Sequence, residues 1–223
     1  MEKYNTIKEF FLYINEHCNY LILRNWDDIF NDHIYGDSHE DIDILCEDLH
    51  SFVSLTNARR CHKRNDRDNF IISIGTMSVR FDIRHVGDGY YPKLWQEKML
   101  LRRKKIGDIY IMSDEDYYYS LAYHALLQKP SLSNEYKNKL RDLTIADRRT
   151  NLFEEKDILK ELNKYLKKNS YVIEITSDPG VFLNWKNIKE IGVKADPSRS
   201  MKRFFFNLSK KITSIYSRFR CMF

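Results

Sequence analysis

One segment of the chain, Asp41-Ile-Asp43-Ile-Leu45-Cys46, alternates acidic and apolar side chains, which is the pattern of a β-strand. Side chains point alternately to the two faces of a strand, so Asp41 and Asp43 share one face, several ångströms apart. Any fold for this chain therefore has to place two carboxylates side by side on a sheet.

The residues around this strand predict further helices and strands. Apolar residues recur at helical spacing near the N-terminus, the run Tyr20–Leu23 is typical of a buried strand, and two β-rich runs flank Gly75-Thr76. The elements expected for this part are a helix over 4–17, strands over 20–23 and 41–46, a helix over 49–55, a charged solvated loop over 58–69 and a hairpin over 70–86.

From residue 95 onward the pattern becomes helical. Ser113 and Asp116 have the spacing of a capping box, and Pro130 ends the helix that they begin. The basic cluster 102–105 predicts a solvated helical face. The remaining expected elements are an extended piece over 109–111, helices over 113–129, 136–145 and 154–169, and a late hairpin over 171–183.

This order predicts an α+β fold, a small mixed β-sheet followed by a helical region. We expect three parts: a core over 1–92, a helical region with the late hairpin over 93–195, and a basic amphipathic C-terminal helix over 196–223.

The composition excludes several classes of protein. With 43% hydrophobic and 14% aromatic residues among 223, the chain can build a core and is not disordered throughout. No apolar run approaches the roughly 18 residues of a membrane span, and the N-terminus lacks a signal-peptide core. The four cysteines are far apart, without a CxxC pair. We therefore expect a cytoplasmic protein with reduced thiols.

The net charge of +5 is unevenly distributed. Residues 201–223 contain six basic residues and no acidic ones, which leaves 31 basic against 32 acidic residues elsewhere. The body therefore gives no strong nucleic-acid signal. The apolar residues of 201–219 lie at helical spacing with basic residues between them. Such a helix either packs on the protein's own body or lies on the surface of an anionic membrane. For a cytoplasmic protein that surface is the inner face of the membrane.

A third acid, Asp82, joins the first two if its strand pairs beside theirs. Asp82 lies within the strand of the predicted hairpin, where aspartate is disfavoured, so its placement needs a reason. One reason is pairing with Arg80 or Arg84. The other is a metal site, because converging carboxylates repel one another unless a cation intervenes, and oxygen ligands favour Mg²⁺ or Mn²⁺.

The arrangement resembles the nucleotidyltransferase superfamily, which has the DNA polymerase beta-like fold. The likeness covers roughly residues 4–90, with the D-h-D strand Asp41-Ile-Asp43 and the later acid in Val79-Arg-Phe-Asp82-Ile. The resemblance implies that Asp41, Asp43 and Asp82 are catalytic ligands of two divalent metals. Segments around Gly87 to Tyr91, 110–116, 123–129 and 171–185 look like a subgroup found with bacterial surface-polysaccharide genes.

The phosphate-binding part departs from that family. A glycine pair usually follows the first strand, whereas here that strand ends in Arg24-Asn25, and Gly36-Asp-Ser38 lies only five residues before Asp41. Arg24 can bind phosphate through its guanidinium instead. The candidate phosphate-binding residues are Arg24, Asn25, Gly36, Ser38, His124 and Lys129. His124 has two possible roles. It either fills a partly buried structural position, or it contacts a substrate phosphate or takes part in proton transfer.

We therefore expect a metal-dependent nucleotidyltransferase that uses a nucleoside triphosphate or a related phosphate donor. The acceptor stays unknown, with surface-polysaccharide biosynthesis as one setting. Two alternatives stay open. One is a catalytically silent scaffold of the same fold, recruited to a membrane or partner by residues 201–223. The other is a toxin-like nucleotidyltransferase that modifies RNA or protein.

Overall fold

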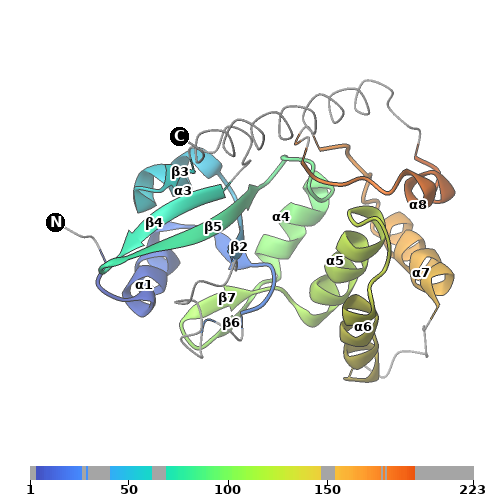
Figure 1. Cartoon of the computed structure of the whole chain (residues 1–223), viewed down its shortest axis with the longest axis horizontal. Coiled ribbons are helices and arrows are strands. Elements are labelled where there is room, and N and C mark those ends of the chain that lie inside the picture. The colour runs from blue at the N-terminus through green and yellow to red at the C-terminus, as the bar shows by residue number, and fades with distance from the viewer. Residues whose placement is uncertain are drawn as a thin grey trace, which may run out of the picture.

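The computed structural model describes residues 4–26, 29, 41–61, 69–146, 154–176, 178 and 180–193. These residues form an α+β fold in which one mixed sheet is followed by a group of helices at one end of the molecule (Figure 1). The predicted fold class is confirmed at this level. The expected C-terminal helix over 201–223 lies outside the described residues, as do Gly36 and Ser38.

The sheet contains seven strands in the order β3-β4-β5-β2-β1-β7-β6. Strand β2 runs antiparallel to β1 on one side and parallel to β5 on the other, and β7 pairs with β1 in parallel. The sheet thus includes two strands that follow residue 92. The strands are β1 (Tyr20–Ile22), β2 (Ile42–Cys46), β3 (Arg59–Arg60), β4 (Asn69–Ile74), β5 (Met77–His85), β6 (Lys104–Ile106) and β7 (Ile109–Ile111).

Seven helices are described in the same part of the chain. The cap expected at Ser113 is present, since its Oγ accepts a hydrogen bond from the backbone N–H of Asp116. The helices are α1 (Ile7–His17), α3 (Leu49–Thr56), α4 (Lys93–Leu101), α5 (Asp114–Leu127), α6 (Asn134–Ala146), α7 (Glu155–Lys168) and α8 (Trp185–Glu190). None of the helices in the described ranges is long and apolar enough to cross a membrane.

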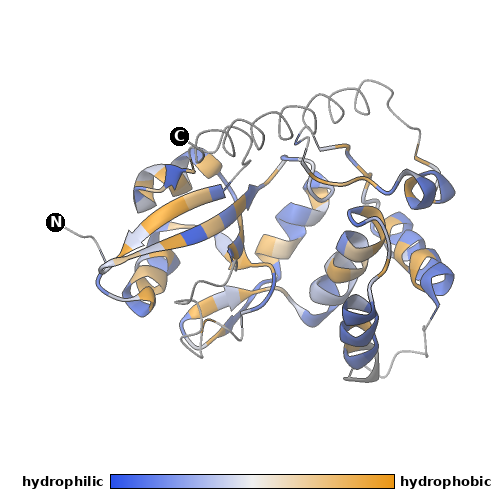
Figure 2. Cartoon of the chain, viewed as in Figure 1, coloured by the Kyte–Doolittle hydropathy of each residue, from blue (hydrophilic) through white to orange (hydrophobic). Residues whose placement is uncertain are grey.

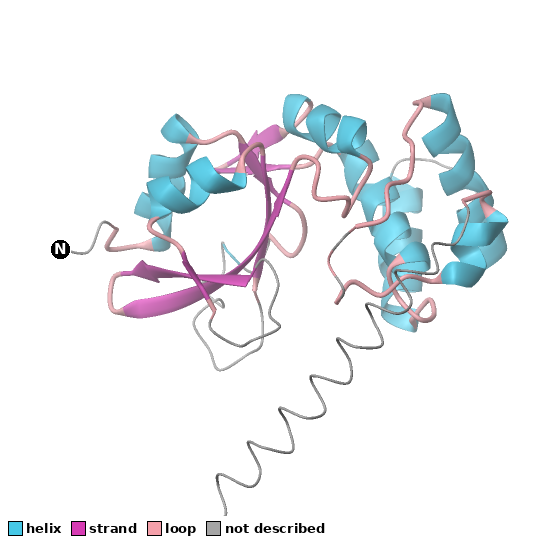
Figure 3. Ribbon diagram, turned by 90° about the horizontal axis from the view of Figure 1, so that it is seen from above, coloured by secondary structure: helices cyan, strands magenta, loops and turns pink. Residues whose placement is uncertain are grey.

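The two faces of the sheet belong to two different cores. Ile22 and Ile44 pack with α1 and α3, whereas Leu21 and Leu45 pack with the residues of α4, α5 and α7. Figure 3 shows helices on both sides of the strands accordingly. Asp43 shares a face with Leu45, so the acidic face of β2 looks toward the helical region.

Helix α5 is the central element of that region. It is buried on nearly every side from Tyr118 to Leu127, unlike the mostly hydrophilic α6 (Figure 2). Its first turn is fixed by Asp116, which is fully buried and accepts a hydrogen bond from Trp95 Nε1 at 2.9 Å. Arg102 pairs with the same carboxylate at 2.6 Å, which satisfies its charge. These contacts hold α5 in place beside the sheet.

Two local predictions were wrong. The described residues of the expected late hairpin, 171–176, 178 and 180–183, contain no strand. Side-chain anchors hold this segment instead: Tyr171 stacks on Trp95, and Thr176 Oγ1 donates to the carbonyl of Asp88 at 2.9 Å. The basic cluster after α4 is not a helical face either, because Lys104–Ile106 pairs with β7 as strand β6.

Gly89 provides a test of how the 171–183 segment docks. Gly89 has a φ of +71°, and a Cβ there would lie 2.9 Å from Thr176 Cα. Gly87, in the same loop, has a φ of +85° but only the flexible end of Lys93 within 4 Å. We expect Gly87→Ala to lower the free energy of unfolding by about 1 kcal/mol through backbone strain. Gly89→Ala should cost at least about 1 kcal/mol more because backbone has to move. Urea denaturation of both variants measures the difference, and equal losses would contradict the close packing.

Candidate functional site

A cavity of about 540 Å³ lies between the acidic face of the sheet and the helical region. Its wall comes from the ends of β1, β2 and β5, from α5 and α6, and from residues 180–182 of the docked segment. Six of the residues expected from the sequence to form a site line this one cavity: Arg24, Asn25, Asp43, Asp82, His124 and Lys129.

The register of β2 against β5 brings the two central acids together. Asp43 is the direct partner of Asp82 across the parallel pair. Adjacent strands lie roughly 4.8 Å apart, and partners in register point to the same face. Both side chains are only partly buried, with exposed fractions of 16% for Asp43 and 22% for Asp82. The expected meeting of these two carboxylates at one surface is therefore present.

Each carboxylate has a guanidinium partner. Arg24 binds Asp43 through two hydrogen bonds, from Nε at 3.1 Å and from Nη2 at 2.9 Å. Arg84 contacts both oxygens of Asp82, at 3.1 Å and 3.2 Å. These bidentate pairs neutralise the two negative charges that the strand register places side by side.

Asp41 lies on the same face but is not part of the cavity wall. It precedes β2 and forms an ion pair with Arg80, with 3.2 Å between Asp41 Oδ1 and Arg80 Nε. All three carboxylates thus contact arginine, as one of the two alternatives expected for Asp82, and two of them face a cavity, while the metal site stays a prediction. The role of Asp41 as a metal ligand stays a prediction.

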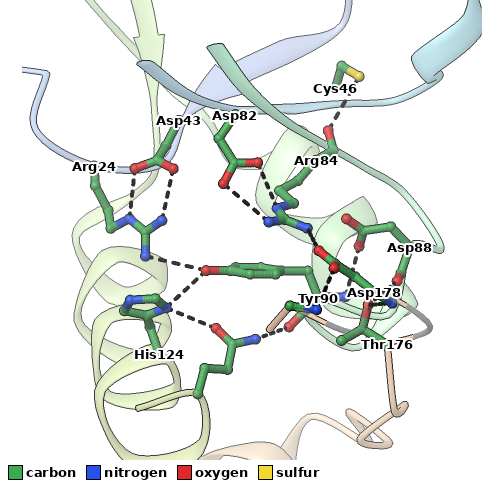
Figure 4. Close-up of polar contacts among 12 residues, drawn as sticks. Arg24, Asp43, Cys46, Asp82, Arg84, Asp88, Tyr90, His124, Thr176 and Asp178 are labelled. Carbon is green, nitrogen blue, oxygen red and sulfur yellow. Dashed lines mark hydrogen bonds and ion pairs between the residues drawn. The ribbon is translucent and has the colours of Figure 1, made fainter. Parts of the chain in front are cut away.

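Tyr90 connects the two ion pairs (Figure 4). Its hydroxyl accepts a hydrogen bond from Arg24 Nη1 at 3.5 Å and lies 2.9 Å from His124 Nδ1. The face of its ring packs against the guanidinium of Arg84, with the carbon Cζ 4.2 Å from the ring centre. One aromatic side chain therefore contacts both arginines and the histidine of the site.

His124 is neutral in this environment. Burial, together with the positive charge of Arg24, holds the pKa of His124 well below its usual 6.5. Gln128 donates from its amide nitrogen to the carbonyl of Tyr90 at 2.6 Å, which directs its oxygen toward His124 Nδ1 at 2.9 Å. That oxygen can only accept, so Nδ1 carries the proton and Nε2 has the lone pair. In this state Nε2 of His124 is a hydrogen-bond acceptor, and the expected contact of His124 with phosphate stays a prediction.

The pKa of Asp82 is shifted upward, whereas that of His124 is shifted downward. Burial raises the pKa of Asp82 to about 6, and the neighbouring Asp43 carboxylate acts in the same direction, against the lowering effect of Arg84. A buried carboxyl beside a second carboxylate is the situation in which a further cation stabilises the ionised form most.

The residues fit a divalent cation in part. Among the described residues, no group of three histidine, cysteine or acidic side chains is arranged to hold a metal ion. Asp43 and Asp82 offer two neighbouring carboxylates that face the cavity, which suits the oxygen preference of Mg²⁺ or Mn²⁺. Their oxygens are engaged by Arg24 and Arg84, so a cation has to compete with a guanidinium.

The outer part of the cavity adds positive charge. Four cationic side chains, Arg24, Arg84, Lys129 and Lys139, and three acidic ones, Asp43, Asp82 and Glu135, line the wall. Glu135 forms an ion pair with Lys139 at 3.0 Å. Asn25 lies at the rim with a φ of +55°. The balance of charge in the cavity thus favours an anionic ligand.

The sequence did not single out several residues of the site. Arg84 entered only as a partner of Asp82, and Tyr90 only within the segment Gly87 to Tyr91 that carries part of the resemblance. Asp178, which pairs with Arg84 at 3.1 Å from 94 residues further along the chain, gave no local signal. The alternation of β5 places Arg84 on the face of Asp82, which is the one pattern that pointed to it.

We compared the chain with protein-family models, curated proteins and solved structures, and none of them matches it.

The neutral state of His124 predicts how stability varies with pH. The histidine of the unfolded chain takes up a proton near pH 6.5, whereas the folded one does so only at lower pH. The free energy of unfolding should therefore fall as the pH drops below 6.5, by up to about 1.4 kcal/mol per pH unit from this group. In His124→Gln this component disappears, and urea denaturation between pH 7 and 5.5 measures it.

The difference between the wild type and His124→Gln removes the contributions of the other titrating groups. Asp82, with its raised pKa, contributes in the opposite direction, but it is present in both proteins and cancels in the difference. An unchanged dependence in His124→Gln would show that His124 is not held neutral.

Proposed function

We propose that the chain is a metal-dependent transferase that moves a nucleotidyl or related phosphate-containing group to an acceptor bound in the same cavity. The observation that carries the proposal is the register pairing of Asp43 with Asp82 at the wall of a cavity that has a surplus of cationic side chains. Acidic ligands beside basic groups are what a metal-bound phosphate requires.

The roles of the residues follow from their contacts. Asp43 and Asp82 would hold the cation, which when bound neutralises charge on the transferring phosphate and favours ionisation of the attacking hydroxyl. Arg24 and Lys129 would bind phosphate oxygens, with Arg24 suited to two parallel hydrogen bonds. His124 Nε2 would accept a hydrogen bond from a ligand hydroxyl and so orient it.

The fixed parts of the site would supply positioning. Arg84 is held by Asp82, Asp178 and the Tyr90 ring, so its charge stays in one place during the reaction. Preorganised charge of this kind stabilises a transition state without rearrangement. A role in surface-polysaccharide biosynthesis rests on the resemblance alone.

A second candidate function is the catalytically silent scaffold. The arginine partners of Asp41, Asp43 and Asp82 favour it, because carboxylates that are already neutralised do not require a metal. Calorimetry with Mg²⁺ and each of the common nucleoside triphosphates separates the two functions. Heat of binding supports the transferase. Its absence with every nucleotide, together with liposome binding that is lost on deletion of residues 201–223, supports the scaffold.

Asp43→Asn tests the transferase directly. The substitution keeps the size of the side chain but removes a cation-binding oxygen, so turnover should fall by about a hundredfold or more, equivalent to about 2.7 kcal/mol in the barrier. The assay is a mass-spectrometric screen for products formed from nucleoside triphosphates, Mg²⁺ and a pool of sugar phosphates.

The matched control is Asp108→Asn, the same chemical change at the β6–β7 turn, where Asp108 pairs with Lys8 outside the cavity. It should keep full turnover. Circular dichroism confirms that both variants are folded, and wild-type turnover in folded Asp43→Asn would exclude the mechanism.

A further inference from the structure

Arg84 and Arg24 differ in how many contacts hold each guanidinium in place. Arg84 is 4% exposed and contacts Asp82 through two nitrogen–oxygen pairs and Asp178 through another, while the Tyr90 ring covers its face. Moving Arg84 would leave Asp178, itself 8% exposed, without this ion pair. Loss of such a buried partner is costly, so Arg84 is a fixed part of the structure.

Arg24 is tied down far less. Within the described part of the chain its side chain contacts Asp43 and, through a long hydrogen bond of 3.5 Å, the Tyr90 hydroxyl. It is more exposed than Arg84, at 14%, and lines the cavity. Figure 4 shows the guanidinium of Arg24 against both oxygens of Asp43. The site thus contains one arginine with several partners, Arg84, and one with few, Arg24.

A divalent cation and Arg24 compete for the same two oxygens. Both positive charges cannot occupy the Asp43 carboxylate without repelling each other. The guanidinium has an alternative partner, however, because phosphate offers it the same bidentate geometry as a carboxylate. A phosphate-bearing ligand in the cavity therefore provides what is needed to release Asp43.

We propose that Arg24 closes Asp43 to divalent cations until a phosphate-bearing ligand takes its guanidinium. Cation and ligand then bind with positive coupling, and by reciprocity each raises the affinity of the other. The inference rests on the proposed function, since it places the cation at Asp43. It goes beyond that function by assigning an order of binding and a residue that enforces it.

The first test uses the metal alone. Mn²⁺ binding to the full chain is measured by the electron paramagnetic resonance signal of the unbound ion. The wild type should bind Mn²⁺ weakly, and Arg24→Gln should bind it at least about tenfold more tightly, because the competing charge is gone. A role of Arg24 in phosphate binding alone would leave the affinity for Mn²⁺ unchanged.

Two further variants locate the effect. Arg80→Gln removes the same charge from the same sheet face, but Arg80 pairs with Asp41 and does not line the cavity. It should bind Mn²⁺ as the wild type does, and an equal gain in both variants would overturn the proposal. In the double variant Arg24→Gln/Asp43→Asn the gain should disappear, whereas a retained gain would place the cation elsewhere and likewise overturn it.

The second test has the wild type as its main sample and Arg24→Gln as its control. Millimolar inorganic phosphate should raise the affinity of the wild type for Mn²⁺, since it offers Arg24 another partner, but not that of Arg24→Gln. The melting temperature gives an independent readout, because a ligand of the folded state stabilises it. No increase in the wild type contradicts the coupling.

The outcomes separate this inference from the proposed function. Tight Mn²⁺ binding to the wild type without phosphate would overturn the role of Arg24 and leave a metal-dependent transferase intact. Absence of Mn²⁺ binding in every protein, with phosphate or with nucleoside triphosphate, would remove both. The expected pattern supports the role of Arg24 whatever product the mass-spectrometric screen detects.

Discussion

Two carboxylates on adjacent parallel strands define the electrostatics of this protein. The register of β2 and β5 puts Asp43 and Asp82 side by side, and the helices that cover this face limit their contact with water. Two such charges can both stay ionised only if positive charge lies close to them. The fold meets this requirement with Arg24, which follows β1, and Arg84, which lies on β5 itself. The strands that create the repulsion thus also carry the groups that relieve it.

The positions of these two guanidinium groups depend on contacts between the helical region and the sheet. Tyr90 contacts both guanidinium groups, and its position depends on Gln128 and His124 of the α5 end. Helix α5 is in turn anchored at its other end by the buried Asp116, which binds Trp95 and Arg102. Damage to that distant buried pair would therefore alter the cavity, although none of its residues lines it. The site is a property of the sheet and the helices together.

The sequence predicted the parts of this arrangement that depend on local periodicity. Alternation placed Asp41 and Asp43 on one face, and an acid within a strong strand marked Asp82. That Asp82 lies beside Asp43 depended on the pairing of β2 with β5, which the prediction assumed and the structure shows. Which arginine binds which acid depends on register and rotamer, so Arg24 was assigned to phosphate without its bond to Asp43. The late hairpin failed for a related reason. Its residues have the pattern of strands, but Asp178 pairs with Arg84 of β5 and Thr176 bonds to Asp88 in the loop after it, contacts that no local pattern encodes. Long-range polar contacts, not the apolar core, were what sequence reasoning missed.

The same contacts bear on how many cations the site can hold. Arg84 engages both oxygens of Asp82 and cannot leave without breaking its ion pair with the buried Asp178. A cation near Asp82 would therefore share that carboxylate with a permanent positive charge. In the described part of the chain Asp43 pairs with Arg24 instead, a guanidinium that, under the proposal above, can turn toward the cavity. Under the proposed function, this geometry would favour one cation, held by Asp43 with Asp82 contributing negative charge beside it, rather than the two that the resemblance implies. The fixed guanidinium of Arg84 would then supply a second positive charge next to Asp82.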